Sequence, residues 1–384
     1  MKRLTRYLRY ILPALLLIVV TACDDDSPDP APTAKEGRRT VLVYMIADNS
    51  LGRNGCDRAD INEMLKSAAQ GGITDGRLLV YHAASGADKG VNPRLIEITP
   101  DGEKTLKEYT DASSVYSVDI ERVRQVLDDV DRIAPARENG LVLWSHGSGW
   151  RELPSSRSFG EDRGVTMKVS SLAKALEGRK FDFIYFDCCL MATVEVVYEL
   201  RHATPTIVAS GTELIDEGMR YDLNIPVFFA PELDLTVAAR NTFEYYNSLV
   251  GQYRTCTMSV INTAGLDDLA SATRAIMETG AKPTVSISGQ QSYMTGLSTI
   301  YDMKRYIETL DCQEELKTQW NSAFDRVIAY AAATERLFGY YPIKYYGGLG
   351  TYILTTPSDA KLYNYDQQSW WKDVVSHNPN FVNK

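Results

Sequence analysis

A cysteine and a histidine each stand just after an apolar run of this sequence. Residues 181–186 are apolar or aromatic at all but one position and lead within three residues to Cys189. Residues 140–144 are apolar and lead within two residues to His146, which Gly147 follows. A thiol becomes a strong nucleophile when a base takes its proton, and histidine is the usual base. If both runs are neighbouring strands, their ends bring the two groups together.

Two interpretations of the cysteine compete. A buried structural thiol is the common state of a cysteine, but a histidine at the end of a second apolar run favours a reactive one. Neighbouring side chains of a strand point to opposite faces. One member of the adjacent pair Cys188 and Cys189 is therefore expected to face the core.

The two runs belong to an alternating series of predicted strands and helices. We expect strands at 40–47, 77–84, 140–144, 181–186 and 206–210, helices at 57–70, 119–133 and 191–200, and a hairpin at 94–109. This alternation predicts a parallel sheet with helices on both faces. His146 and Cys189 would lie at its carboxyl edge, where open α/β sheets have their active sites.

The pattern is weaker in the last third of the chain. We expect helices at 236–251, 267–280, 293–310 and 314–338, and strand-like runs at 255–262 and 347–355. A polar, glycine-containing loop is expected at 151–168, between the His146 and Cys189 runs. The predicted organisation is a catalytic domain at 38–224 and a helix-rich region at 225–384 packed on the sheet.

The segments Trp144-Ser-His-Gly-Ser-Gly-Trp150 and Asp187-Cys-Cys-Leu-Met191 resemble the motifs of the clostripain-type cysteine peptidases. That family belongs with caspases, gingipains and legumains. It usually has Asp-Ala-Cys-Leu-Met, so Cys189 matches the nucleophile and Cys188 replaces alanine. The resemblance extends over about residues 38 to 356. It implies a caspase-like α/β/α sandwich with a mostly parallel central sheet.

The resemblance also implies a mechanism. Cys189 would attack the scissile carbonyl as a thiolate, and His146 would take the thiol proton and later protonate the leaving amine. By resemblance to caspases, the backbone amides of Gly147 and Cys189 would bind the oxyanion. No cofactor is implied. Some relatives depend on calcium, but no loop here has the spacing of an EF-hand.

Relatives cut after Arg and sometimes Lys, which requires a carboxylate in the specificity pocket. Asp187 matches a position with that role; Glu213, Asp216 and Glu217 are alternatives. Asp187 could instead orient the turn by accepting backbone N–H bonds. The family usually has proline where this chain has Arg220, so a peptidase of another specificity stays open.

Relatives cleave themselves in the loop between the two catalytic strands. If this chain does the same after a basic residue, the candidates are Arg157 and Arg163. The alternative is an uncut surface loop.

The N-terminus has the pattern of a bacterial lipoprotein signal peptide. Residues 1–22 have a basic start and a short apolar stretch, and Val-Thr-Ala precedes Cys23, the expected lipidation site. The competing interpretation is an ordinary secretory peptide with a chance cysteine. Residues 23–37 are acidic and proline-rich, as in a disordered linker. We expect an exported lipoprotein of the cell envelope, at the outer membrane or cell surface.

Composition narrows the possible partners. The 384 residues carry a net charge of −9, which argues against nucleic acid binding. The other cysteines form no regular disulfide pattern, and the histidines are too scattered for a zinc site. We expect a monomer that acts on peptide or protein substrates. The alternative function is a catalytically inactive surface lipoprotein of caspase-like fold that serves as a binding module.

Overall fold

A computed structural model of the chain describes residues 36–151, 158–293 and 300–381. Residues Ala34–Lys384 form one compact unit with hydrophobic clusters of its own, as expected of a part that folds independently. The predicted signal peptide (1–22), Cys23 and nearly all of the predicted linker (23–37) lie outside the described residues. Among those described, no helix is both long and apolar enough to span a membrane.

A nine-stranded sheet runs through this unit in the order β12-β10-β9-β8-β5-β1-β2-β3-β4. The five central strands are parallel: β9 (Thr206–Ala209), β8 (Phe183–Asp187), β5 (Ala136–Trp144), β1 (Gly37–Ile46) and β2 (Gly76–Ala83). Antiparallel pairs extend both edges: β3 (Arg94–Thr99) with β4 (Gly102–Glu108), and β10 (Thr257–Asn262) with β12 (Ile328–Ala333). The mostly parallel sheet and the hairpin near residue 100 are confirmed.

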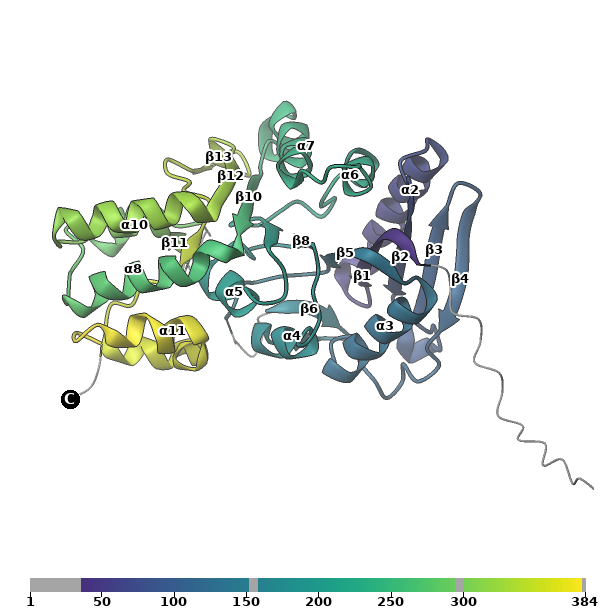
Figure 1. The fold of residues 1–384 in the computed structure, drawn as a ribbon, viewed down its shortest axis with the longest axis horizontal. Helices are drawn as coiled ribbons and strands as arrows, with labels where there is room; N and C mark the ends of the chain where they lie inside the picture. The colour runs from purple at the N-terminus through teal and green to yellow at the C-terminus, as the bar shows by residue number, and fades with distance from the viewer. Residues whose placement is uncertain (1–35, 152–157, 294–299, 382–384) are drawn as a thin grey trace, which may run out of the picture. The chain divides into compact units, whose positions relative to one another are not determined.

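Helices cover both faces of the sheet (Figure 1). One face packs against α2 (Cys56–Ala69), α6 (Tyr221–Phe228) and α7 (Leu235–Ser248), with the short α1 (Ser50–Arg53) before them. The other packs against α3 (Ile120–Ile133), α4 (Val169–Ala175), α5 (Val194–Glu199), α8 (Leu266–Glu278), α10 (Glu314–Val327) and α11 (Ser369–Asp373). Short helical segments are η1 (Ala87–Lys89), η2 (Gly251–Tyr253), η3 (Thr263–Gly265), η4 (Ile287–Gly289), η5 (Pro357–Gln367) and η6 (Val375–His377).

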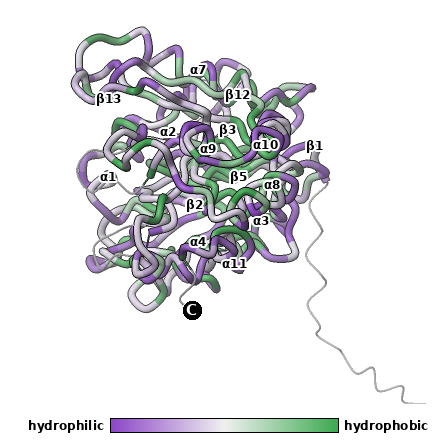
Figure 2. The backbone as a smooth tube through the Cα atoms, turned by 90° about the vertical axis from the view of Figure 1, so that its left-hand side faces the viewer, coloured by the Kyte–Doolittle hydropathy of each residue, from purple (hydrophilic) through white to green (hydrophobic). Residues whose placement is uncertain are grey.

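Strand β1 shows why the sheet lies in the middle. Val41, Val43 and Met45 are buried on one face, while its intervening residues are buried on the other. A strand that is apolar on both faces requires cover on both, as in parallel sheets. Figure 2 shows the matching pattern, with hydrophobic strands in the interior and hydrophilic residues on the outer turns of the helices.

The last third of the chain departs from the predicted pattern. The helix expected at 314–338 ends with α10 at Val327, and β12 follows at Ile328–Ala333. The β12 segment is rich in alanine, which favours a helix. Its antiparallel pairing with β10 overrides that local preference. A contact between residues so distant in sequence could not be predicted from local pattern alone.

Two other expected elements are shorter than predicted. In the segment 293–310, the helical part among the described residues is α9 (Met303–Glu308), which Asp302 begins by accepting a bond from the Arg305 amide. The strand expected at 347–355 is reduced to β15 (Gly350–Thr351), paired with β11 (Tyr301–Asp302). The division of the chain at residue 224 stays a prediction, and both of its parts contribute strands to one sheet.

The predicted loop at 151–168 holds a small hairpin of β6 (Phe159–Asp162) and β7 (Val165–Met167). Phe159 is fully buried and packs edge-on against Phe186 of β8. The hairpin therefore fixes the end of this segment against the sheet. A second small hairpin, β13 (Arg336–Leu337) with β14 (Tyr341–Pro342), projects beyond β12.

Candidate active site

Two adjacent parallel strands deliver the predicted histidine and cysteine to one edge of the sheet. Trp144 at the end of β5 pairs in register with Asp187 at the end of β8. His146 and Cys189 each lie two residues beyond that pair. Because both residues follow this pair of strand ends by the same number of positions, both lie at the carboxyl edge of the sheet.

The loops that follow these strands pack tightly at Gly147. A Cβ atom added there would lie 2.5 Å from the carbonyl oxygen of Cys189 and 3.2 Å from the Cβ of Cys188. A side chain does not fit into that space. Glycine therefore allows the backbone after His146 to lie directly against the backbone of Cys189.

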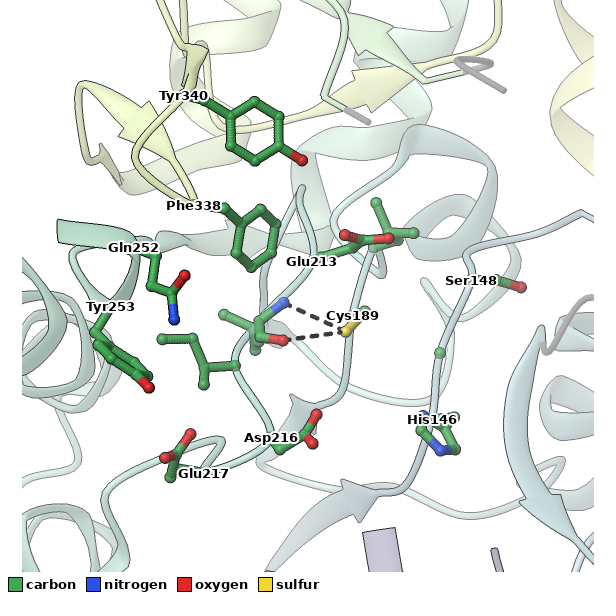
Figure 3. A pocket seen from close by; sticks show the side chains of 14 residues that line it. His146, Ser148, Cys189, Glu213, Asp216, Glu217, Gln252, Tyr253, Phe338 and Tyr340 are labelled. Atoms are coloured by element: carbon green, nitrogen blue, oxygen red, sulfur yellow. Dashed lines mark hydrogen bonds between the residues drawn. The ribbon is translucent and has the colours of Figure 1, made fainter. Parts of the chain in front are cut away.

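The adjacent cysteines differ in their surroundings. Cys188 is buried and belongs to the hydrophobic core, whereas Cys189 is half-buried and lines an open cavity of about 810 Å³. His146 lines the same cavity, as Figure 3 shows. His146 and Cys189 therefore share this cavity, whereas Cys188 does not line it.

The thiol of Cys189 is enclosed by the segment that follows β9. The backbone N–H of Leu214 donates to Sγ at 3.3 Å, and Sγ lies 3.7 Å from the carbonyl oxygen of the same residue (Figure 3). Burial is the main cause that raises the pKa of the Cys189 thiol to about 12; the Leu214 N–H acts against it, and nearby Glu213 and Asp216 act in the same direction as burial. At neutral pH the thiol in this state keeps its proton, so its reaction requires a base.

Ser50 contacts the imidazole of His146, with Oγ 2.7 Å from Nε2. Ser50 opens α1, and the preceding residue, Asn49, caps that helix by accepting a bond from the Leu51 amide. The buried Asn49 side chain also donates to the carbonyl oxygen of Ile46 in β1. The end of β1 therefore holds a hydroxyl against the histidine of β5, a contact that the sequence analysis missed.

Asp187 is buried beneath the cavity. Its Oδ1 accepts a bond from the Met219 amide at 2.7 Å, so this carboxyl orients the turn at Gly218, where φ is +57°. Its Oδ2 has no hydrogen-bond partner, although the Tyr221 hydroxyl lies close enough to lower its pKa. Burial raises the pKa of Asp187 to about 7. One oxygen thus serves the turn, and the Tyr221 hydroxyl is the nearby donor for the carboxyl.

The other predicted acids lie around the same cavity. Glu213 is half-buried, Asp216 and Glu217 are exposed, and all three line it. A narrow recess of about 30 Å³ connects Asp216 and Asp187 with His146 and Cys189. The structure therefore gathers every acid that the sequence analysis named around Cys189.

Arg220, where the chain departs from the family pattern, points elsewhere. Its guanidinium pairs with Asp222 at 2.8 Å and with Glu63 at 3.1 Å, and it stacks on Tyr245. Arg220 is not among the residues that line the cavity. The presence of arginine at this position, in place of the family's proline, therefore leaves the acidic residues that line the cavity in place.

The two candidate self-cleavage residues are placed differently. Arg157 lies outside the described residues. Arg163 lies in the turn between β6 and β7 with φ of +51°. Its side chain pairs with Asp162 and stacks on Tyr116, and its amide donates to the carbonyl oxygen of Asp48. The Arg163 peptide is thus held in a folded turn and not in an extended form.

One wall of the cavity was not predicted. Across the cavity from His146 and Cys189 lie Tyr253 of η2 and, at the tip of the β13–β14 hairpin, Phe338 and Tyr340 (Figure 3). They lie outside the segment 38–224 to which the sequence analysis assigned catalysis. Their contribution arises because β12 joins the sheet and carries the hairpin to the carboxyl edge.

Within residues 36–151, 158–293 and 300–381, no group of three or more His, Cys, Asp or Glu side chains is arranged to hold a metal ion. The five cysteines in these ranges are free thiols.

Comparisons with known proteins agree with this geometry. Residues 43–369 match the model of the clostripain family. The chain is 29% identical to an inactive zymogen of a C11 protease from Parabacteroides distasonis, with 88% of this chain and 99% of that chain covered and a TM-score of 0.75. It is 27% identical, with the same coverage and TM-score, to a secreted C11 cysteine protease from Bacteroides thetaiotaomicron solved with an irreversible peptide inhibitor.

A further secreted protease of Bacteroides thetaiotaomicron, iotapain, is 22% identical and supports the fold, with a TM-score of 0.77 over 88% of this chain and 99% of that chain. No curated protein sequence matched. The family match spans most of the chain, and the structural matches confirm the caspase-like α/β architecture. The chain belongs to the clostripain family and is a cysteine peptidase.

Proposed function

We propose that this peptidase is an endopeptidase that cuts after Arg or Lys, with Cys189 as nucleophile and His146 as base. The observation that carries the proposal is the shared register: both residues lie two positions beyond the Trp144–Asp187 pair and line one cavity. A base and a thiol so placed can exchange a proton across the cavity edge.

The reaction follows from this arrangement. His146 takes the thiol proton, and Sγ of Cys189 attacks the scissile carbonyl to form a tetrahedral oxyanion. The amides of Gly147 and Cys189 stabilise that oxyanion. The imidazolium then protonates the leaving amine, which leaves a thioester on Cys189. Water, deprotonated by His146, hydrolyses the thioester and restores the thiol.

Ser50 supports the proton transfer. Because it contacts Nε2 of His146, the proton from the thiol goes to Nδ1, and the imidazolium that forms can donate its Nε2 proton to the hydroxyl. A hydroxyl that accepts from Nε2–H stabilises the charged ring and fixes its orientation.

The buried oxygen of Asp187 supports a cationic substrate residue. The Oδ2 oxygen of this buried carboxyl has only the neutral Tyr221 hydroxyl near it, and a guanidinium or ammonium group would supply a charged donor. Its charge would also ionise Asp187, whose pKa is raised to about 7 in the free protein. Asp216 and Glu213 at the mouth would add attraction for the same cation.

The recess as it stands is too small for an arginine side chain, because it measures about 30 Å³. Substrate entry therefore requires the Leu214–Asp216 segment to move off the thiol. Self-cleavage in the segment 151–168 is the event that we expect to permit this movement, with Arg157 favoured over the folded Arg163.

The proposed location is the outer membrane or cell surface, through a lipid anchor at Cys23. The signal sequence of residues 1–22 supports it, and one related structure is of a secreted protease. Metabolic labelling with a fatty acid analogue tests it, because label would enter the wild type and be absent from Cys23→Ala.

A panel of fluorogenic peptides with different residues before the cut tests the catalytic proposal. The protein from Ala34 onward is compared with Cys189→Ala and, as a matched control of equal size, Cys188→Ala. Cleavage after Arg or Lys by the wild type and the control, and none by Cys189→Ala, is the expected result. Activity that survives Cys189→Ala, or cleavage only after uncharged residues, would contradict it.

A further inference from the structure

The wall of the cavity opposite the catalytic pair consists of aromatic side chains. Tyr253 and Tyr340 are 52% and 62% exposed, and Phe338 is half-buried between them and the floor. Exposed apolar side chains that gather in one concave surface usually mark a binding site. These three line the same cavity as Cys189, so whatever binds them can also reach the thiol.

The hairpin that carries two of these rings is firmly attached to the sheet. Thr334, which follows β12, donates its N–H to the carbonyl oxygen of Cys256, and Ile343 donates its N–H to the carbonyl oxygen of Glu335. Leu337 is buried beneath the tip. A wall fixed in this way can select a ligand without first being ordered by it.

The conformation at the tip of the hairpin is unusual for the residues that occupy it. The Tyr340 amide donates to the carbonyl oxygen of Leu337, and the two residues between them, Phe338 and Gly339, have φ of +51° and +78°. Such a turn favours Asn-Gly, because a bulky residue is strained at positive φ. A phenylalanine kept in that conformation, with its ring in the cavity, is typical of a functional site.

The hairpin tip and η2 form one continuous surface. A Cβ atom added to Gly339 would lie 3.6 Å from the backbone of Gly251 and of Gln252. Tyr253 therefore extends the wall that Phe338 and Tyr340 begin, as Figure 3 shows.

The order of groups across the cavity indicates which part of a peptide meets this wall. Leu214 lies against the thiol of Cys189, and in Figure 3 Phe338 and Tyr253 lie on the other side of Cys189 from His146. The acidic recess opens beside Leu214, Ile215 and Asp216. The chain that precedes a residue held in the recess can therefore reach the aromatic rings by passing over Leu214.

We infer that Tyr253, Phe338 and Tyr340 form a subsite for a bulky apolar side chain of the substrate, such as Leu, Ile or Phe. This side chain belongs to the second or third residue before the basic residue, which itself lies directly before the cut. This inference rests on the proposed cleavage after a basic residue. The cavity of about 810 Å³ has room for several peptide residues. The peptidase would therefore select an apolar-then-basic sequence and not a basic residue alone.

Peptide aminocoumarins test the subsite. Each peptide ends in Arg and carries Leu, Gly or Arg in turn at each of the three preceding positions. At the second or third position before the arginine, the wild type is expected to cleave the Leu peptide at least about tenfold more efficiently than the Gly peptide, by kcat/KM. Equal values, or a preference for Arg at every position, would overturn the subsite.

Variants locate the preference. Tyr340→Ala removes an exposed ring, and Phe338→Asn removes a ring while keeping a residue that tolerates positive φ. In both, the ratio of Leu to Gly cleavage should fall below about threefold. Tyr345→Ala is the matched control, because Tyr345 is 44% exposed and does not line the cavity, and it should keep the wild-type ratio. An unchanged ratio in both wall variants would also overturn the subsite.

The same experiment separates this inference from the proposed function. If peptides ending in another residue are cleaved instead, the basic specificity is wrong and the ratio is measured with that residue. If no peptide is cleaved, binding of the Leu and Gly peptides to Cys189→Ala is measured by calorimetry. At least tenfold tighter binding of the Leu peptide supports the subsite, and equal binding contradicts it.

Discussion

Replacing Asp187 with asparagine should stabilise the protein at alkaline pH while removing cleavage after Arg and Lys. Asparagine keeps an oxygen that can accept the bond from the Met219 amide. It replaces the oxygen that has no partner with an amide group that carries no charge. The change therefore removes the charge of a buried carboxylate while preserving the bond that orients the turn.

The size of the effect follows from the pKa. Burial raises the pKa of Asp187 from an ordinary 3.8 to about 7. The folded protein thus holds this proton more tightly than the unfolded chain. The resulting stabilisation is complete below pH 4 and is lost as pH rises to about 7, a loss of roughly 4 kcal/mol in the free energy of unfolding. Only about a third of that loss has occurred at pH 5.

Urea unfolding of the chain from Ala34 at pH 5 and pH 8 measures this change in the free energy of unfolding. The advantage of Asp187→Asn over the wild type should be about 2 to 3 kcal/mol larger at pH 8 than at pH 5. Asp216→Asn is the control, because it removes an exposed carboxylate from the same cavity and should change stability by less than about 0.5 kcal/mol at both pH values. An advantage of Asp187→Asn that does not grow with pH would refute the reasoning.

Three further predictions concern other parts of the site. Ser50→Ala should lower kcat/KM about 5- to 10-fold and shift the acidic limb of its pH profile, because His146 loses the hydroxyl at its Nε2. Gly147→Ala should reduce kcat/KM at least about 100-fold, since its Cβ would lie 2.5 Å from the carbonyl oxygen of Cys189. Arg163→Ala should leave self-cleavage intact, because the Arg163 peptide is held in a turn; mass spectrometry of the fragments measures this.

Each of these has a control. Ser50→Thr keeps a hydroxyl and should retain most of the activity; equal losses in both variants would show that Ser50 acts only through folding. Gly164→Ala is the comparison for Gly147→Ala, because nothing lies within 4 Å of its added Cβ; its φ of +82° is positive, unlike that of Gly147, so the comparison includes backbone strain but no clash. Arg157→Ala should block self-cleavage, and fragments that still end at residue 163 would contradict the prediction.

The parallel core and the shared position of His146 and Cys189 at its edge could be predicted because their signals are local. Each central strand is a short apolar run bounded by polar or glycine residues, and the Cys189 and His146 runs end in reactive side chains. The carboxyl ends of neighbouring parallel strands lie at the same edge of a sheet. Assigning the two runs as neighbouring strands therefore predicts that His146 and Cys189 lie close together. The register between Trp144 and Asp187 confirms that expectation.

The remainder depends on contacts between distant residues. Ser50 and His146 are 96 positions apart, and nothing in the local pattern around Ser50 marks it for that contact. The segment Ile328–Ala333 has a helical composition and becomes a strand only because β10 offers it an edge. That same pairing brings Phe338 and Tyr340 to the cavity, so missing the strand also meant missing the aromatic wall.

Covalent labelling with a peptidyl-arginine chloromethyl ketone tests the central claim most directly. The chain from Ala34 is treated with the inhibitor, digested, and the modified cysteine is identified by mass spectrometry. The account predicts an adduct on Cys189 that forms far more slowly in His146→Ala and whose formation is slowed by an arginine-containing substrate. An adduct on Cys188, or labelling of Cys189 at the same rate without His146, would contradict it.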